Sequence, residues 1–147
     1  MVPLRKLERL ANNIKKGCKC CGVGCGTCAS KVGRMRGYSE ANIPVVYWDL
    51  PFKNFKGDPR FGDKVRVILK DIDKFYDEGK SYAFVGNLGT GKTYAACCIA
   101  KASVVAGYDV IYKNMSEIVS KSIANSDDFL EELINCDILC IDEYDSR

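Results

Sequence analysis

Residues 86–93 read Gly-Asn-Leu-Gly-Thr-Gly-Lys-Thr, a spacing of residue types that could bind a triphosphate. Glycines let the backbone adopt conformations in which successive N–H groups converge on phosphate oxygens. Lys92 adds a positive charge for the β- and γ-phosphates, and the Thr93 hydroxyl is suited to ligating Mg²⁺. The pattern therefore predicts an ATP site with these cofactor-binding residues: Gly86, Asn87, Leu88, Gly89, Thr90, Gly91, Lys92, Thr93 and Tyr94.

Two further candidates for catalysis end an apolar run at residues 136–143, Cys-Asp-Ile-Leu-Cys-Ile-Asp-Glu. Such a run is expected of a buried parallel strand that delivers side chains at its C-terminal edge. Asp142 is placed to hold Mg²⁺, and Glu143 to polarise the water that attacks the phosphate. We therefore predict Lys92, Asp142 and Glu143 as catalytic residues, and Thr93 with Asp142 as the Mg²⁺ ligands.

Near the N-terminus the chain carries two closely spaced Cys-x-x-Cys pairs, Cys18/Cys21 and Cys25/Cys28. Four thiolates suit tetrahedral Zn²⁺, and the intervening glycines allow tight turns around the metal. The linker between the pairs is much shorter than the 15–20 residues usual in a four-cysteine ribbon. We predict a zinc site, where Cys20 is a fifth thiol that could replace a neighbour as ligand, and leave an iron–sulfur cluster or no metal as the alternatives.

Composition restricts the class of protein. The chain has 147 residues, a net charge of +3, nine cysteines and no histidine. No apolar run approaches the roughly 20 residues that cross a bilayer, so no membrane partner is expected. The N-terminus lacks the apolar stretch of a signal peptide, and we expect a cytoplasmic protein. Residues 1–36 carry a charge of +8 and the remainder −5, which favours a nucleic-acid or acidic partner for the basic head.

The helices and strands that position these residues are predicted from the periodicity of apolar residues and from the glycines and prolines that interrupt it. We expect a basic amphipathic helix over 4–14, a connector without long regular elements over 29–60, and one helix over 60–78. An apolar strand should occupy 82–86 before the phosphate loop, and a helix 91–106 after it. Further strands are predicted at 108–113 and 137–142, with helices at 115–123 and 127–135. Cys97, Cys98, Cys136 and Cys140 lie on apolar faces and read as buried thiols.

Together these segments resemble the helicase-loader ATPases of the DnaC/DnaI/IstB group, within the AAA+ class. The resemblance rests on Ala41-Asn42-Ile43-Pro44, on Phe52-x-x-Phe55-Lys56-Gly57-Asp58, on the phosphate loop and on the strand that ends at Asp142-Glu143. It implies ATP and Mg²⁺ as cofactors and contact with a replicative helicase and single-stranded DNA. It also implies a P-loop NTPase (AAA+/ASCE) α/β core, with homo-oligomerisation left open.

The resemblance also implies the strand order 5-1-4-3-2, with a fourth strand between strands 82–86 and 137–142. That strand is absent from the sequence, so we expect an incomplete parallel sheet of three strands and weak or no hydrolysis by this chain. We divide the chain into a Cys-rich, zinc-knuckle-like head (1–36), a connector (37–59) and the ATPase core (60–147). The leading function is an ATP-binding helicase loader in DNA replication. The alternatives are a transposition accessory ATPase and a non-catalytic binding module.

Overall fold

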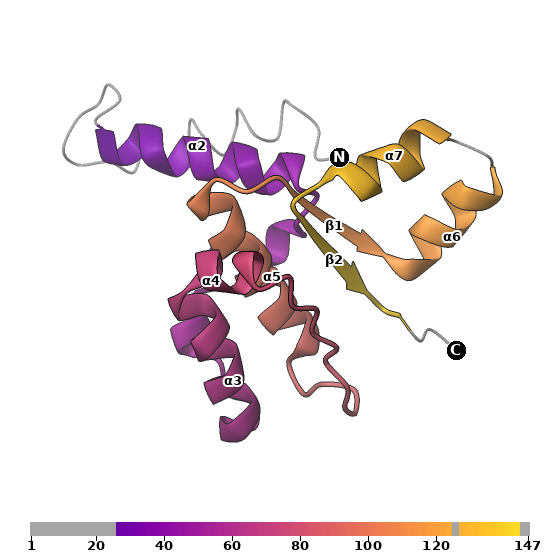
Figure 1. Cartoon of the computed structure of the whole chain (residues 1–147). Helices are drawn as coiled ribbons and strands as arrows, with labels where there is room; N and C mark the ends of the chain where they lie inside the picture. The colour runs from indigo at the N-terminus through magenta and orange to yellow at the C-terminus, as the bar shows by residue number, and fades with distance from the viewer. Residues whose placement is uncertain (1–25, 125–126, 145–147) are drawn as a thin grey trace.

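A computed structural model describes residues 26–124 and 127–144 of the chain. The predicted helix over 4–14 and three of the four predicted zinc ligands, Cys18, Cys21 and Cys25, lie outside the described residues. The helices are α2 (Gly26–Glu40), α3 (Pro59–Lys70), α4 (Ile72–Asp77), α5 (Lys92–Ala106), α6 (Met115–Ile123) and α7 (Asp127–Asn135). Two short 3₁₀ turns, η1 (Val45–Tyr47) and η2 (Phe52–Asn54), and two strands, β1 (Val110–Asn114) and β2 (Ile138–Asp142), complete the described elements (Figure 1).

The described sheet consists of β1 and β2, which run parallel. Val110 pairs with Ile138 at one end and Asn114 with Asp142 at the other. Parallel strands need a long crossover, and here α6 and α7 provide it. Both strands and both crossover helices lie at or within two residues of their predicted bounds. This arrangement confirms the α/β class and brings Asp142 to the C-terminal edge of the sheet.

Helix α5 is the central element of the described core. It contacts both strands and also α2, α3 and α4, so it is covered on more than one side (Figure 1). One apolar cluster joins Cys97 and Ala100 of α5 to Trp48, Val110 and Tyr112. A second cluster joins Ala95 and Ile99 of α5 to apolar residues of α3 and α4: Val65, Ile68 and Ile72. Burial against both clusters fixes the start of α5, which is the end that carries Lys92.

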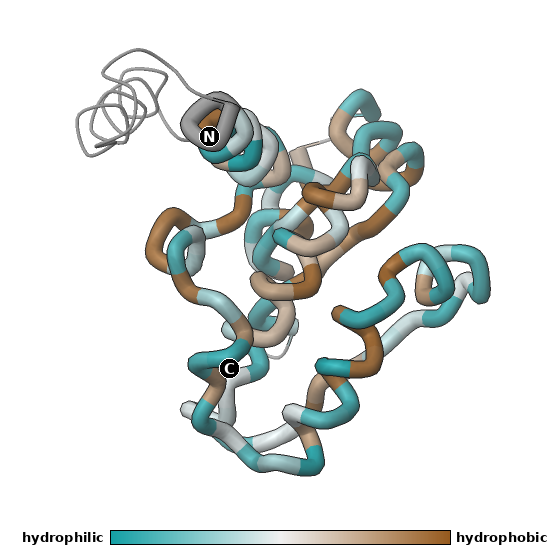
Figure 2. Tube along the Cα trace, turned by 90° about the vertical axis from the view of Figure 1, so that its left-hand side faces the viewer, coloured by the Kyte–Doolittle hydropathy of each residue, from teal (hydrophilic) through white to brown (hydrophobic). Residues whose placement is uncertain are grey.

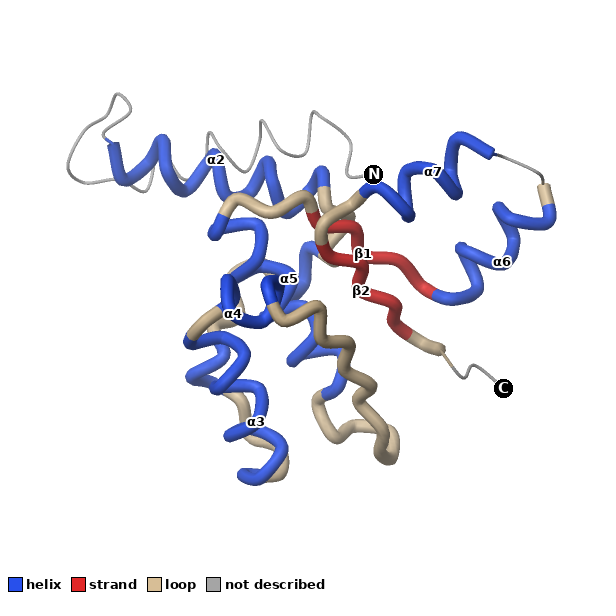
Figure 3. The backbone as a smooth tube through the Cα atoms, in the orientation of Figure 1, coloured by secondary structure: helices blue, strands red, loops and turns tan. Residues whose placement is uncertain are grey.

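The predicted strand at 82–86 is not a strand in the structure, because residues 80–91 form an irregular segment between α4 and α5 (Figure 3). The three-stranded sheet is therefore corrected to two described strands. The segment lies largely in solvent: Tyr82 is 51% exposed and Val85 95% exposed. An extended segment becomes a strand only when a neighbour supplies hydrogen bonds to its backbone. No described strand does so here, although the residues themselves favour a strand.

Two helix predictions also need correction. The single helix expected over 60–78 is broken at Asp71, whose side chain accepts a hydrogen bond from the Lys74 N–H at 3.1 Å and so begins α4. The connector expected from residue 29 instead begins as the helix α2, which continues to Glu40. The prolines behave as predicted beyond it, since Pro44 and Pro51 precede the two 3₁₀ turns.

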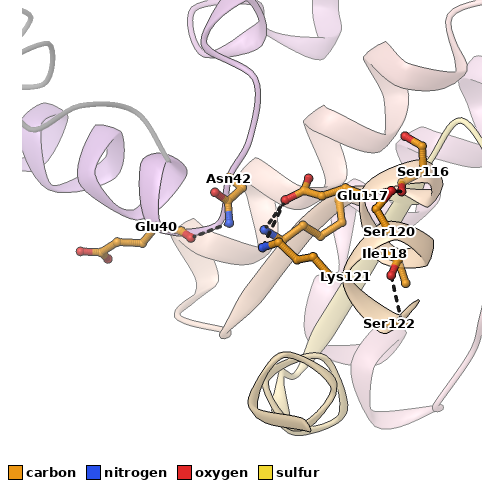
Figure 4. A network of polar contacts seen from close by, with 9 residues as sticks. Glu40, Asn42, Ser116, Glu117, Ile118, Ser120, Lys121 and Ser122 are labelled. Atoms are coloured by element: carbon orange, nitrogen blue, oxygen red, sulfur yellow. Dashed lines mark hydrogen bonds and ion pairs between the residues drawn. The ribbon is translucent and has the colours of Figure 1, made fainter. Parts of the chain in front are cut away.

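Figure 2 shows hydrophilic and hydrophobic residues alternating along the helices, as expected of elements that bury one face. On α6, Glu117 accepts from Lys113 at 3.2 Å and pairs with Lys121 at 3.6 Å; Glu117 and Lys121 are labelled in Figure 4. The α6–α7 pair also leaves Ile123 and Ile134 exposed. Within the described ranges, no helix combines the length and the apolar character needed to cross a bilayer.

Candidate nucleotide site

The phosphate loop is shaped by two glycines in the left-handed region. Gly89 has a φ of +79° and Gly91 a φ of +89°, conformations that side-chain-bearing residues rarely adopt. Gly91 is also the residue from which α5 starts. A Cβ at this position would lie 2.5 Å from Cε2 of Phe55. The loop therefore needs glycine here both for its backbone angle and for its close approach to an aromatic ring.

Lys92 lies across the inside of the loop. Its Nζ donates to the carbonyl oxygens of Gly86 and Asn87, each at 2.8 Å. The Thr90 hydroxyl donates to the same Asn87 carbonyl at 2.9 Å, which closes the turn. A flexible ammonium held by neutral carbonyls can move to a stronger anionic acceptor when one arrives. The predicted role of Lys92 as a phosphate ligand fits this position.

The structure brings Thr93 and Asp142 together although they are far apart in the sequence. The Thr93 hydroxyl donates to Oδ1 of Asp142 at 3.2 Å, which joins the start of α5 to the end of β2. The backbone N–H of Glu143 also donates to Oδ1, at 3.0 Å. Both side chains are partly buried. Helix and strand thus place a hydroxyl and a carboxylate at one point beside the loop, as the motif spacing predicts.

Tyr112 on β1 completes this arrangement, and nothing in the motif indicated it. Its hydroxyl donates to Oδ2 of Asp142 at 2.6 Å. Burial, together with this hydrogen bond, raises the pKa of the Tyr112 phenol far above its usual value. The phenol is therefore a permanent donor at physiological pH. The sequence carries one signal that could have indicated this role: a buried tyrosine in an otherwise apolar strand needs a hydrogen-bond partner for its hydroxyl.

Glu143 follows Asp142 with a φ of +52°, and the residue is exposed. Exposure leaves the carboxylate accessible to water, which the predicted water-polarising role requires. Glu143 directly follows Asp142 and lies at the same edge of the sheet. Its catalytic role stays a prediction.

Buried thiols line the inner side of the site. Burial raises the pKa of the Cys97 thiol to about 11 and that of Cys140 to about 12. Both are therefore neutral at physiological pH and add no charge behind Asp142. Cys97 and Cys98 are buried, as predicted, whereas Cys136 and Cys140 are only partly buried, and all four are free.

A cluster of phenylalanine rings packs against the phosphate loop. Phe55 stacks on Phe52 with ring centroids 5.0 Å apart and meets Phe61 edge to face at 5.7 Å. Phe61 in turn meets Phe84, in the segment before the loop, at 5.2 Å. Gly57 lies so close to Phe55 and to the Thr90 carbonyl that a Cβ would clash with both. The segment 52–58 therefore acts as the floor of the phosphate loop, a role that its sequence alone did not indicate.

The connector is tied to α5 just beside the site. Lys101, only 8% exposed, donates from Nζ to the carbonyl oxygens of Tyr47 and Leu50 at 2.5 and 2.6 Å. The Tyr94 hydroxyl donates to the Pro51 carbonyl at 2.8 Å. Tyr94 thus holds the connector in this structure, and its predicted part in cofactor binding stays a prediction.

The residues present fit a magnesium–nucleotide complex. Thr93 and Asp142 supply hard oxygen ligands of the kind that Mg²⁺ prefers. The free N–H groups at the start of α5 and the nearby ammonium of Lys92 suit an anion. Within residues 26–124 and 127–144, no group of three or more Cys, Asp or Glu side chains could hold another metal ion. The zinc prediction at Cys18, Cys21 and Cys25 falls outside these residues, and Cys28 lies in α2.

Comparison with known proteins agrees with this geometry. The profile of the AAA family, the "ATPase family associated with various cellular activities", matches residues 82–147. The replicative helicase loader DnaC of Buchnera aphidicola subsp. Schizaphis graminum is 27% identical over 127 residues, covering 78% of this chain and 50% of the relative. The chain thus spans about half the length of this curated relative. No solved structure matches the chain. The family profile begins at the segment that leads into the phosphate loop and includes β2, so residues 82–147 are similar to the AAA family of ATPases, and the chain resembles a DnaC-type relative.

Proposed function

We propose that this chain binds ATP with Mg²⁺ and acts as a helicase loader in DNA replication. The observation that carries the nucleotide part is the contact between Thr93 and Asp142, 3.2 Å apart, beside a loop that holds the Lys92 ammonium. Bound Mg²⁺ would neutralise phosphate charge there. Lys92 would leave its carbonyl partners for the triphosphate, while Asp142 and Thr93 would hold the ion. Glu143 would orient water.

The loader part of the proposal is supported by the relative, whose name states that it is a replicative helicase loader. We propose a replicative helicase and single-stranded DNA as partners, in the cytoplasm. The basic N-terminal head, with a charge of +8 over residues 1–36, suits an acidic protein surface or a nucleic-acid backbone. Co-purification of the chain with the replicative helicase of its source organism, with and without residues 1–25 of the head, which precede α2, tests this partner. Equal recovery without the head would contradict its role.

Removal of the Lys92 charge tests nucleotide binding. We expect Lys92→Ala to weaken Mg²⁺–ATP binding by about tenfold or more, because a charge-assisted hydrogen bond to phosphate is lost. Titration with a fluorescent ATP analogue measures this. Lys80→Ala is the matched control, since Lys80 pairs with Glu78 on the surface and should not affect affinity. Equal affinity of wild type and Lys92→Ala would refute the assignment of the loop.

The same preparations test for a metal in the head. We expect elemental analysis to find about one zinc per chain, lost when Cys18 and Cys21 are both changed to serine. Cys97→Ser is the control, because this buried thiol packs in the core beside Tyr112. Visible absorbance from iron would replace zinc by an iron–sulfur cluster, and a folded, metal-free protein would exclude both.

A further inference from the structure

Tyr112 lies where the sheet register lets it reach the metal-binding carboxylate. Tyr112 pairs with Cys140, and Asn114 pairs with Asp142. Because side chains alternate along a strand, Tyr112 projects from the same face of the sheet as Asn114, and hence the same face as Asp142. The two residues are diagonal neighbours, and the length of a tyrosine spans the distance between them. The 2.6 Å contact from the Tyr112 hydroxyl to Oδ2 is therefore a consequence of register.

The contacts divide the two carboxylate oxygens of Asp142 between two tasks. Oδ2 accepts from Tyr112, on the inner side of the site. Oδ1 accepts from the Thr93 hydroxyl and from the Glu143 N–H. A carboxylate held at Oδ2 cannot rotate about its Cβ–Cγ bond without losing a short hydrogen bond. Oδ1 is consequently kept facing Thr93, the other predicted Mg²⁺ ligand.

We propose that Tyr112 is a positioning residue, which fixes Oδ2 of Asp142 so that Oδ1 meets Mg²⁺ together with Thr93. This inference rests on the proposed nucleotide function and adds to it a residue outside both nucleotide motifs. The phosphate loop binds phosphate locally, so Tyr112 acts on the magnesium-dependent part of ATP affinity. It has no part in the affinity that remains without the metal.

Tyr112 is itself held from several sides. Its ring is 3% exposed and packs in the cluster that contains Met35 and Trp48. Its backbone N–H donates to the Ala41 carbonyl at 2.8 Å, so the connector fixes the strand from its outer edge. The packing of the ring does not require the hydroxyl. Phenylalanine at this position should keep the packing and lose only the hydrogen bond to Asp142.

The test compares ATP binding by the full chain in Mg²⁺ and in EDTA. We expect Tyr112→Phe to bind ATP in EDTA as wild type does, and to lose about tenfold or more of the Mg²⁺-dependent gain in affinity. Tyr108→Phe is the matched control, because that hydroxyl donates to Asp73, away from the site, at 2.8 Å. Circular dichroism checks the fold; if Tyr112→Phe does not fold, Tyr112→Met fills the same cluster without a hydroxyl.

A double-mutant cycle separates positioning from a merely structural role. Asp142→Asn should abolish the Mg²⁺-dependent gain, and adding Tyr112→Phe should then cause no further loss. Additive losses in the cycle, or an unchanged Mg²⁺-dependent gain in Tyr112→Phe, would overturn the inference while leaving the proposed function intact. Absence of ATP binding by wild type would instead overturn the proposed function, and this inference with it.

Discussion

Gly91 shows how a single residue shapes the site. Its φ of +89° lies in the left-handed region, and a Cβ there would meet the ring of Phe55. Gly89 shares the first constraint, with a φ of +79°, but a Cβ at Gly89 would meet nothing within 4 Å. Substitution of Gly89 therefore tests the cost of backbone strain alone. Substitution of Gly91 tests that cost together with a clash against Phe55.

We expect Gly89→Ala to cost about 1–3 kcal/mol in the free energy of unfolding, the range for a residue held in an unfavourable backbone conformation. Gly91→Ala should cost more, because Phe55 or the loop must also shift. Urea unfolding of both variants measures the difference. An equal loss of unfolding free energy in the two variants would mean that Phe55 moves aside without cost. Segment 52–58 would then not be packed tightly against the loop.

The residues of the site differ in how far the sequence could predict them. Spacing predicted Lys92 and Thr93 from a local motif and Asp142 from the strand that precedes it; the structure brings Thr93 and Asp142 into contact, and the roles of all three stay predictions. Tyr112 was missed because its role depends on the register between two strands, which no local pattern encodes. Phe55 was part of the resemblance, but its contact with Gly91 appears only when the connector is folded onto α5.

At the scale of elements, Lys101 decides how the connector meets α5. Its ammonium is buried and donates to two backbone carbonyls, those of Tyr47 and Leu50. Methionine has a similar apolar stem but no donor. Lys101→Met would leave both carbonyls without this partner in a part-buried setting, although it also removes the cost of burying a charge.

We expect the lost donors to dominate, so that Lys101→Met lowers the free energy of unfolding by about 1–3 kcal/mol. Lys64→Met, at an exposed position of α3, is the control and should change stability by less than about 0.5 kcal/mol. Thermal or urea unfolding checks both. A more stable Lys101→Met protein would show that burial of the charge outweighs its two hydrogen bonds.

Element predictions succeeded where the signal was local. The apolar run before Asp142 predicted β2, and the periodicity of residues 127–135 predicted α7. The helix break at Asp71 was missed because an aspartate within an amphipathic pattern is typical of an exposed helix position. Only the structure shows that its side chain caps α4. The prediction of a strand at 82–86 was wrong for a different reason: a segment forms a strand only when a neighbouring strand supplies hydrogen bonds to its backbone.

At the scale of the whole molecule, the described chain brings the glycine-rich loop, Thr93 and Asp142 together around α5, beside a described sheet of two strands. The edge of β2 that faces away from β1 pairs with no described strand, and Leu139 and Ile141 of β2 are 38% and 41% exposed. Contacts between Thr93, Asp142 and Tyr112 join the start of α5 to both described strands.

The hydrogen bond from the Tyr112 N–H to the Ala41 carbonyl has a consequence for self-association. A sheet with two bare edges can recruit copies on both sides and grow without limit, as aggregating β-proteins do. Here the connector contacts the middle of the β1 edge, whereas no described strand pairs with the outer edge of β2. Pairing through β2 would then consume the accessible edge of each molecule and end with two copies. We therefore expect any association through the edges of the described sheet to end with two copies rather than to continue as an open-ended polymer.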